Sequence, residues 1–215
     1  MAAQTAATRE NEPRIPARAR ILAAAAELFY QHGIRAVGVE AIAEAAGTNK
    51  MTLYRHFSSK DELVAEYLRQ SAAAANECWE RFAQAHPGDS LAQLWAWIEE
   101  MAGHLAQPNE RGCALANAAI ELPEKDHPAR RVIEENKKAH RQRLVQLSEA
   151  AGLSEPEMLA DELHLLLEGA RVTAQSIGTD GLAERLLHMG RAMIAAHTPR
   201  RGSQRRSKTP RVRRP

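Results

Sequence analysis

One short segment of the chain carries side chains suited to recognising a polyanion that also displays hydrogen-bonding edges. It runs from Lys50 to Phe57 and reads KMTLYRHF. Ammonium, hydroxyl, phenol, guanidinium and imidazole groups lie on it, while Leu53 and Phe57, four residues apart, form its apolar side. Such groups donate hydrogen bonds to phosphates, which set the register of a protein on a duplex, and to base edges, which carry sequence information. The segment therefore favours non-covalent recognition of double-stranded DNA.

The residues before this segment indicate how it is positioned. Val39, Ile42 and Ala46 recur at the spacing of one helical face, and Gly47 separates that pattern from the next one. Two short helices joined by a turn that contains glycine form a helix-turn-helix, whose second helix enters the DNA major groove. The same pattern also fits an ordinary packed corner of a helical domain, so that alternative remains open at this point.

Position along the second helix predicts what each side chain contacts. Asn49 is expected to cap this helix, because its side-chain oxygen accepts a backbone N–H that the first turn leaves free. The positive end of the helix then faces the duplex, and the first turn reads base edges. Tyr54, His56 and Lys60 lie further along and are expected to contact phosphates. The predicted DNA-contacting residues are Asn49, Lys50, Met51, Thr52, Tyr54, Arg55, His56 and Lys60.

Residues 19–68 resemble the N-terminal domain of the tetracycline-repressor (TetR) family of bacterial transcription regulators. The run KMTLYRHF is similar to the recognition-helix signature of that family, which is a specific motif. The matching residues are Ile21, Leu22, Ala25, Leu28, Phe29, Gly33, Ile42, Ala43, Ala46, Gly47, Lys50, Thr52, Leu53, Tyr54, His56, Phe57, Ser59, Lys60, Glu62 and Leu63. The resemblance implies an all-α, nine-helix TetR-like architecture: an N-terminal three-helix helix-turn-helix domain, then a helical ligand-binding and dimerisation domain. It also implies a homodimeric repressor that a small-molecule effector releases from a palindromic operator.

The chain departs from the pattern of that family at two places. Many members carry a threonine pair just before the first helix of the motif, and one hydroxyl binds phosphate. Val37 and Gly38 stand there in this chain, so we expect backbone N–H groups to make that contact, or none to make it. Met51 replaces a residue that is often glycine or alanine, and it is expected either to contact a thymine methyl group or to shift the helix.

Helical periodicity, interrupted by proline and glycine, divides the chain into four parts. Residues 1–15 are expected to be disordered, 16–60 to form the helix-turn-helix domain, 61–198 to form the ligand-binding and dimerisation domain, and 199–215 to be a disordered basic tail. Outside the motif, helices are predicted at about 16–31, 60–84, 90–107, 112–122, 129–151, 155–177 and 182–197. Ser59, Ser90 and Ser154 are the expected N-caps, and Glu62 is expected to complete a capping box with Ser59.

Charge is distributed unevenly along the chain. Residues 1–60 hold eight Lys/Arg and five Asp/Glu, residues 61–199 hold thirteen and twenty-two, and residues 200–215 hold eight and none. An acidic body with basic ends predicts a protein that touches DNA with one part only. The basic tail either strengthens DNA binding without sequence preference or is an ordinary solvated end.

Composition narrows the class of protein further. Hydrophobic residues make up 44% and aromatic residues 4% of 215 residues, and no stretch approaches the roughly eighteen apolar residues of a membrane span. No secretory signal is visible, so a cytoplasmic, nucleoid-associated location is expected. Cys78 and Cys113 lack metal-ligand spacing and are expected to be small buried residues, although a thiol beside a pocket would suit a redox sensor. Neither a metal nor another cofactor is expected.

The last two predicted helices carry more apolar residues than a narrow core face requires. Two such helices from each subunit would form a four-helix bundle, and a two-fold dimer is the commonest oligomer. The predicted dimer-interface residues are Leu159, Leu163, Leu166, Leu167, Ala170, Leu182, Leu186, Met189 and Met193. The alternative is that both helices simply cover the core of a monomer.

An apolar pocket with a few polar groups is expected between the helices from residue 60 to residue 177. Its predicted apolar walls are Trp79, Phe82, Trp95, Ile98, Met101, Leu105, Ile120 and Leu144. Its predicted polar contacts are Asn117, Glu121, His140, Arg171 and Gln175. Each polar residue taken alone also fits an ordinary core or surface role.

Three classes of function fit these patterns to different degrees. A ligand-responsive DNA-binding regulator fits all of them, and its partners would be a double-stranded operator, an unknown small-molecule effector and a second copy of the chain. A small-molecule-binding helical protein with weak or vestigial DNA binding is favoured only by Val37 and Gly38. Binding of nucleic acid through the basic tail alone is the third. Because no catalytic triad, Cys/His pair or paired carboxylates occur at meaningful spacing, an enzyme is not expected.

Overall fold

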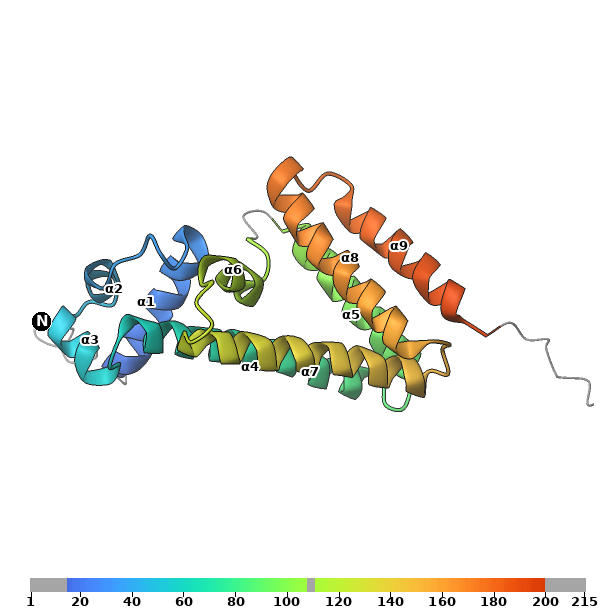
Figure 1. Ribbon diagram of the computed structural model, residues 1–215, viewed down its shortest axis with the longest axis horizontal. Helices are drawn as coiled ribbons and strands as arrows, with labels where there is room; N and C mark the ends of the chain where they lie inside the picture. Colours follow the sequence, from blue (N-terminus) through green and yellow to red (C-terminus); the bar gives the residue numbers. More distant parts are fainter. Residues whose placement is uncertain (1–14, 108–110, 200–215) are drawn as a thin grey trace, which may run out of the picture.

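The computed structural model describes residues 15–107 and 111–199, and within these ranges it contains helices and no strand. The all-α prediction is therefore confirmed for the described residues. The helices are α1 (Ala17–His32), α2 (Val39–Ala45), α3 (Lys50–His56), α4 (Lys60–Ala85), α5 (Ser90–Leu105), α6 (Ala114–Glu121), α7 (Pro128–Ala150), α8 (Pro156–Ile177) and α9 (Leu182–His197) (Figure 1). The predictions of disorder at 1–14 and 200–215 lie outside the described residues.

Helices α1, α2 and α3 form a small three-helix unit at one end of the molecule (Figure 1). Ile21, Ile42 and Leu53 contribute one fully buried side chain from each helix, which is why the three short helices pack around a common centre. Gly47 has φ +60° in the turn between α2 and α3, a backbone conformation that favours glycine. The predicted helix-turn-helix is confirmed.

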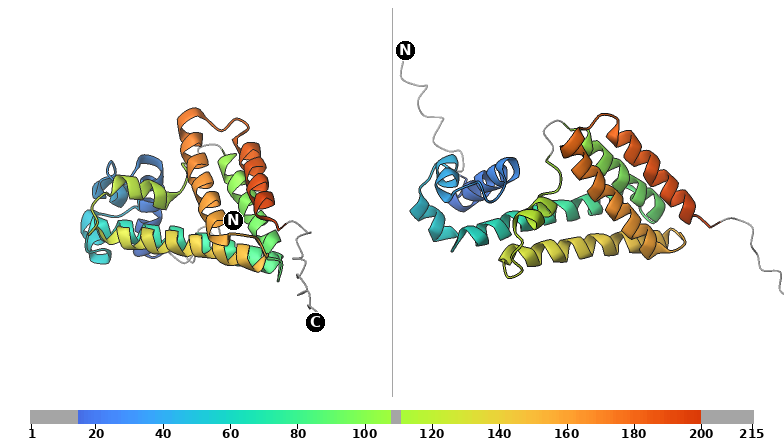
Figure 2. Two further views of the ribbon diagram at one scale, coloured as in Figure 1. Left: turned by 45° about the vertical axis from the view of Figure 1, so that its right-hand side comes forward. Right: turned by 45° about the horizontal axis from the view of Figure 1, so that its top comes forward.

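Helix α4 is the longest element, and it connects this unit to the rest of the molecule. It runs for 26 residues from the α1–α3 unit into the far half of the protein, and α7 lies along it (Figures 1 and 2). Beyond the midpoint, α5 and α8 pack on the α4–α7 pair, and α9 packs on α5 and α8 (Figure 2). A rotation of α4 would therefore move the helix-turn-helix relative to the body.

The buried side chains fall into two clusters that do not follow the predicted domain boundary at residue 60. The first joins the α1–α3 unit to the N-terminal half of α4, to α6 through Leu115, and to the start of α7 through Ile133. The second joins the C-terminal half of α4 to α5, α7, α8 and α9, with Leu94, Leu144 and Leu163 among its buried members. Helix α6 thus packs with the α1–α3 unit, which we call the DNA-binding unit after its predicted role, and the division at residue 60 stays a prediction.

The expected helix caps are partly wrong. At α4, the Ser59 hydroxyl accepts from the N–H of Glu62 as predicted, but the Glu62 carboxylate accepts from Ser58 rather than Ser59. At α5 the cap is the Asp89 carboxylate, which lies one residue before the predicted Ser90. A charged carboxylate is the stronger acceptor for the free N–H groups of the first turn.

The predicted cap of α8 is also wrong. The residue before this helix is Glu155, in a left-handed conformation with φ 49° and without a capping hydrogen bond from its side chain. The Ser154 hydroxyl instead donates to the carbonyl oxygen of His197 at the end of α9. Ser154 therefore connects the start of α8 to the end of α9, a long-range contact that the local sequence does not reveal.

Candidate functional site

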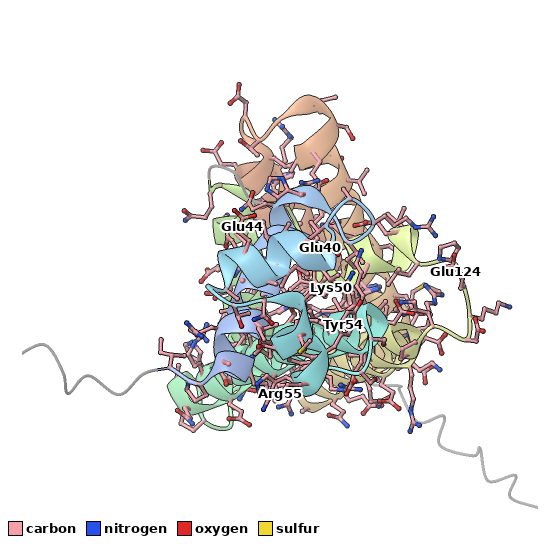
Figure 3. The ribbon with its side chains drawn as sticks, turned by 90° about the vertical axis from the view of Figure 1, so that its left-hand side faces the viewer. Glu40, Glu44, Lys50, Tyr54, Arg55 and Glu124 are labelled. Carbon is pink, nitrogen blue, oxygen red and sulfur yellow. The ribbon has the colours of Figure 1, made fainter. Side chains whose placement is uncertain are left out.

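Helix α3 presents a polar face to solvent at the end of the molecule. Leu53 and Phe57 are buried in the first core cluster, so the opposite side of the helix points away from the protein. Lys50, Tyr54 and Arg55 lie on this outer face, as Figure 3 shows. The predicted contact residues Met51 and His56 are exposed too, whereas Thr52 is half-buried.

Asn49 caps α3 as predicted, with its side-chain oxygen 2.9 Å from the backbone nitrogen of Thr52. The capping oxygen is therefore occupied, which leaves the amide NH₂ of Asn49 as its free group for a duplex. Met51, in the first turn of α3, is 77% exposed, so a large apolar side chain faces solvent at the start of this helix. This arrangement suits contact with the methyl group of thymine, the apolar feature of the major groove.

A carboxylate next to this face was missed by the sequence analysis. Glu40, in the first turn of α2, accepts a hydrogen bond of 2.6 Å from the ammonium of Lys50 (Figure 3). This bond lowers the pKa of the Glu40 carboxyl and raises the pKa of Lys50. Both groups are exposed, so the pair is solvated and can open when a phosphate competes for the ammonium.

We expect Glu40→Gln to raise affinity for DNA of random sequence and to steepen its salt dependence. In this variant, Lys50 can bind a phosphate without first breaking its ion pair with residue 40. Each additional phosphate contact adds about one unit to the slope of log affinity against log salt concentration. Fluorescence anisotropy of a labelled duplex across a KCl series measures both quantities, and we expect affinity to rise by about threefold to tenfold at 0.1 M salt.

Glu44→Gln is the matched control for this prediction. Glu44 lies one turn further along α2, is exposed, and has no ion pair with another described residue. An equal gain in both variants would mean that the paired carboxylate has no specific role, and that only the total charge of the surface matters.

Lys60 is placed differently from the phosphate-binding role predicted for it. Its ammonium donates to the carbonyl oxygen of Ile34 at 2.6 Å and lies 5.9 Å from the ring centre of Phe29. Partial burial lowers the pKa of Lys60. The ammonium therefore holds the α1–α2 loop against the start of α4 and would have to leave this position to reach a phosphate.

The two departures from the family pattern are also placed. Val37 is buried in the first core cluster, so its side chain faces away from any duplex. Gly38 precedes α2 and offers no side-chain cap. A phosphate contact at this point would have to come from the backbone N–H groups at the start of α2.

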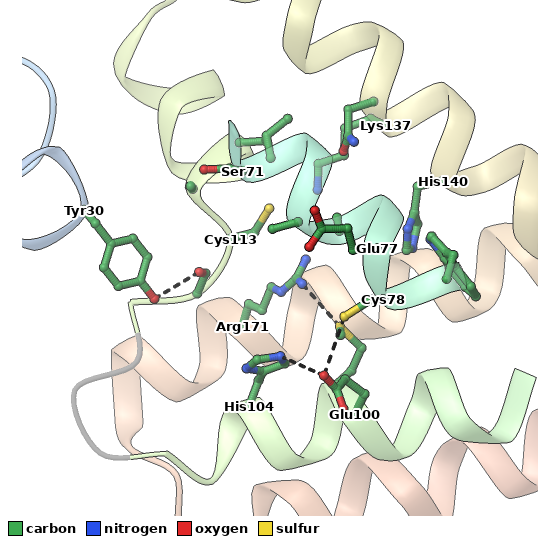
Figure 4. Close-up of a pocket in the computed structure, with 18 of the residues that line it drawn as sticks. Tyr30, Ser71, Glu77, Cys78, Glu100, His104, Cys113, Lys137, His140 and Arg171 are labelled. Carbon is green, nitrogen blue, oxygen red and sulfur yellow. Dashed lines mark hydrogen bonds and ion pairs between the residues drawn. The ribbon is translucent and has the colours of Figure 1, made fainter. Parts of the chain in front are cut away.

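A cavity of about 720 Å³ lies between the DNA-binding unit and the body (Figure 4). Ala23, Ala26 and Tyr30 of α1 line it, together with residues of α4, α5, α7 and α8 and of the segment that begins α6. The volume falls in the range of small-molecule sites. Its place between two parts of the molecule is also typical of such sites.

The structure brings some of the predicted pocket residues together and separates others. Trp79, Met101, Leu105, His140 and Arg171 line the large cavity. Asn117, Ile120, Glu121 and Gln175 line a separate hollow of about 300 Å³ between α1, α6 and the end of α8. Within it, Ile120 is 78% exposed, so it does not form an apolar wall.

The remaining predicted wall residues do not line the large cavity. Phe82, Ile98 and Leu144 belong to the second core cluster, where they are buried, and Trp95 packs half-buried against its edge. Trp97, which was not predicted, faces the cavity instead of Trp95. The error arises because α5 is covered on two sides, by α4 and α7 and by α9, so nearly every apolar position on it fits some buried face.

A charged cluster lies in the cavity wall, formed by the predicted Arg171 and by Lys137 and Glu168, which the sequence analysis missed. Oε1 of Glu168 accepts from the Lys137 ammonium at 2.6 Å and from the Arg171 guanidinium at 2.9 Å. These two cations lower the pKa of the Glu168 carboxyl against the effect of its burial. His140 lies beside them, and burial lowers its pKa to about 3, so this imidazole is uncharged (Figure 4).

One signal could have located this cluster. Lys137 and His140 are three residues apart on α7, and Glu168 and Arg171 are three apart on α8, so each pair shares one helical face. The sequence does not show that these two faces meet. The contribution of Tyr30 from α1 had no signal, because it depends on how the DNA-binding unit packs on the body.

A set of hydrogen bonds connects the cavity edge to the DNA-binding unit. The Tyr30 hydroxyl accepts from the N–H of Arg111 at 2.9 Å and donates to the carbonyl oxygen of Gly112 at 3.3 Å. At the far end of α6, the Arg35 guanidinium donates to the Glu121 carbonyl at 2.6 Å and to the Glu124 carboxylate at 2.9 Å. Both ends of the segment 111–124 are thereby attached to the α1–α2 region.

Most of the predicted dimer residues face the core of their own subunit. Leu159, Leu163, Leu167, Ala170, Leu182 and Leu186 are buried, and Leu166 and Met193 pack half-buried against the same cluster. Of the predicted set, Met189 is exposed. A side chain that its own subunit buries contributes no area to an interface, so these six residues cannot form one without rearrangement.

A different set of residues forms the outer apolar face of α8. Met158, Leu165 and Val172 are spaced by seven residues, and they are 55%, 70% and 60% exposed. Residues seven apart lie on one side of a helix. The apolar excess that the sequence showed is therefore present, but on side chains that the sequence analysis did not select.

The part of the chain that the structure describes contains neither a cluster of metal-binding side chains nor a membrane-spanning helix. No group of three His, Cys, Asp or Glu side chains there is arranged to hold a metal ion. No helix within residues 15–107 and 111–199 is both long and apolar enough to span a membrane. Cys78 and Cys113 are unpaired and half-buried at the cavity, and burial raises the pKa of Cys78.

Comparison with known proteins matches both parts of the molecule. The family model described as "Bacterial regulatory proteins, tetR family" matches residues 21–67. A solved TetR transcriptional regulator from Streptomyces avermitilis is 32% identical, with a TM-score of 0.73 over 85% of this chain and 98% of that one. The match to this solved structure thus spans the DNA-binding unit and the body.

Curated relatives match over a shorter length. The transcriptional activator FasR of Mycolicibacterium smegmatis is 45% identical over 58 residues, 27% of this chain and 26% of that protein. The transcriptional repressor KstR2 of Mycobacterium tuberculosis is 33% identical over 110 residues, 51% of this chain and 46% of that protein. The chain thus spans less than half the length of both curated relatives.

Proposed function

This chain belongs to the tetR family of bacterial regulatory proteins, and from this premise we propose that it is a homodimeric repressor that a small molecule releases from DNA. The observation that carries the proposal is the position of the 720 Å³ cavity, which α1 of the DNA-binding unit bounds on one side and α4, α5, α7 and α8 bound on the other. A molecule that fills this space contacts both parts at once.

The DNA step uses the outer face of α3. Lys50, Met51 and Thr52 are on its first turn, where the recognition helix of such motifs reads base edges, and Tyr54, Arg55 and His56 lie closer to the phosphates. The exposure of Lys50, Met51, Tyr54 and Arg55 supports this assignment. Lys60 has only a secondary role in it, because its ammonium is engaged with Ile34.

The dimer step uses the outer face of α8 together with Met189 of α9. Met158, Leu165 and Val172 give this face an apolar surface that a second copy would cover. In a two-fold dimer the same face meets itself, and two α3 helices separated by about 34–36 Å reach successive major grooves. A palindromic operator is the expected DNA partner.

The release step depends on the connections between the cavity and the DNA-binding unit. A ligand that wedges α1 away from the segment 111–124 would strain the bonds of Tyr30 and Arg35 and turn α4, whose first half shares the core of the DNA-binding unit. The ligand shifts the balance only by its difference in affinity for the two arrangements. Moving occupancy from mostly bound to mostly free needs about 5 kcal/mol of that difference.

Selection of duplexes from a random pool with the full chain tests the DNA and dimer steps. We expect an inverted repeat, with half-site centres one helical turn or a multiple of it apart, bound by two or another even number of chains. Analytical ultracentrifugation of the complex measures the number of chains. Enrichment of duplexes without two-fold symmetry, or one chain on a specific site, would contradict the proposal and would favour a small-molecule-binding protein with weak DNA binding.

A further inference from the structure

The charges in the cavity wall indicate which class of small molecule it accepts. We propose that the effector is an amphipathic monoanion: its carboxylate binds Lys137 and Arg171, and its hydrocarbon body lies along the apolar part of the wall. The term effector rests on the proposed function, whereas the binding preference is a property of the cavity and needs no DNA. The chemistry is that of a medium-chain or aromatic carboxylic acid.

The charged cluster in the wall has one cation more than its carboxylate balances. Lys137 and Arg171 share Oε1 of Glu168, and the three side chains are only 24%, 21% and 27% exposed. A charge withdrawn from water is stabilised by an opposite charge and by hydrogen bonds at close range. A second carboxylate, supplied by a ligand, would balance the excess.

The two cations also have donors that the protein uses poorly. Nη2 of Arg171 is directed at the sulfur of Met101, 3.5 Å away, and a thioether is a weak acceptor. The Lys137 ammonium has three donors, and its bond to Glu168 is the one it makes to described residues. A carboxylate in front of both groups would accept charge-assisted hydrogen bonds, which are stronger than the present contact with sulfur.

His140 adds a polar contact without adding charge. Its ring centre lies 5.4 Å from those of Trp79 and Trp97, and its side chain faces the same cavity as Lys137 and Arg171 (Figure 4). Because burial lowers its pKa to about 3, the imidazole stays neutral at any physiological pH. It can therefore orient an anionic head or a nearby carbonyl group through a hydrogen bond.

The rest of the inner wall suits a hydrocarbon body. Trp79 and Trp97 are stacked with ring centres 5.9 Å apart, and Met101, Leu105 and Leu115 continue the apolar surface. The alanines of α1 and α4 leave the space open rather than filling it. A flexible or planar apolar group gains here the free energy of leaving water.

Other carboxylates at the cavity do not cancel this preference. Glu100 is paired with Arg81 at 3.0 Å, and Glu27 and Glu77, which also line the cavity, are exposed and form no ion pair with Lys137 or Arg171. Water and salt screen exposed charges strongly, whereas the half-buried cluster is screened less. The exposed acids that line the cavity favour a molecule with a single negative charge over one with several.

Three ten-carbon probes that differ only in the head group test the proposal. Isothermal titration calorimetry of the full chain without DNA, at pH 7 and below micelle-forming concentrations, compares decanoate, decanol and decylammonium. We expect decanoate to bind at least about tenfold more tightly than decanol, about 1.4 kcal/mol, and decylammonium to bind most weakly. Equal or tighter binding of decanol or decylammonium, or no binding of decanoate, would overturn the proposal.

Variants of the cluster give effects of opposite sign. Glu168→Gln removes the competing carboxylate and should tighten decanoate binding, whereas Lys137→Gln should weaken it about tenfold and leave decanol unchanged. Arg171→Lys keeps the charge and should keep most of the preference, with thermal melting used to verify that each variant is folded. A decanoate-to-decanol ratio that stays the same in both Glu168→Gln and Lys137→Gln would exclude these contacts.

A gel shift on the selected operator separates this inference from the proposed function. If decanoate binds with the expected preference and the complex with DNA also dissociates, both stand. If decanoate binds and the complex persists, the anion site stands while release by a ligand from this cavity fails. If DNA binding is specific and dimeric but decanoate does not bind, the proposed ligand class alone is wrong.

Discussion

Replacing both Leu165 and Val172 by aspartate is expected to give a folded monomer that binds the operator at least about a hundredfold more weakly. Both side chains are largely exposed on the outer face of α8, so the change leaves the core of the subunit intact. In a dimer, each copy would place these carboxylates against their symmetry mates. A monomer contacts only one half-site, so it loses the increase in affinity that comes from binding two linked half-sites at once. This increase is commonly about 10²–10⁴-fold.

Sedimentation velocity and a gel shift on the same preparation measure both parts of this prediction. Ala139→Asp, an exposed position on α7 outside the proposed interface, is the matched control for adding a carboxylate to a helix surface. We expect this control to remain dimeric and to bind DNA as the parent does. A dimer that persists in the α8 variant would place the interface on another face.

The second large effect is expected when Lys50 and Tyr54 are both changed to alanine. Both lie on the outer face of α3, and neither contributes to the buried core of the DNA-binding unit, to which Leu53 and Phe57 belong. Each contact is lost twice in a dimer, so operator affinity should fall on the order of a hundredfold or more. Binding of decanoate and the sedimentation of the dimer should not change.

Lys138→Ala is the matched control for the loss of one positive charge in this double variant. Lys138 is exposed on α7, outside the α3 face, and its ion pair with Glu134 is a weak surface contact of 3.8 Å. Competition by random duplex shows whether specific or general affinity is lost. Unchanged operator binding by the α3 variant would remove α3 from the interface.

Local sequence patterns were sufficient to predict those features that depend on residues close together in the chain. The helix-turn-helix follows from the apolar spacing of Val39, Ile42 and Leu53 and from Gly47, and the Asn49 cap follows from the preference of a helix N-terminus for a side-chain acceptor. These interactions span at most a few turns. The all-α class and the ends of most helices depend on the same kind of short-range signal.

Patterns failed where two surfaces of similar chemistry compete for the same residues. Leu163 and Leu165 are both leucines on α8, yet one is buried in its own subunit and the other is exposed. Hydrophobicity records how many apolar positions a helix has, and it does not record which neighbour covers each of them. The same ambiguity led to Trp95 being selected for the cavity instead of Trp97.

By itself, the sequence determined the all-α fold, the helix-turn-helix and the family, because these rest on short-range spacing and on a specific local motif. Only the tertiary structure decided that Glu40 holds Lys50, that Lys60 faces inward, and that Lys137, Glu168 and Arg171 meet at a cavity bounded by α1. Such contacts join residues of different helices. Their energies depend on distance and on exclusion of water, which the packing of the whole chain sets.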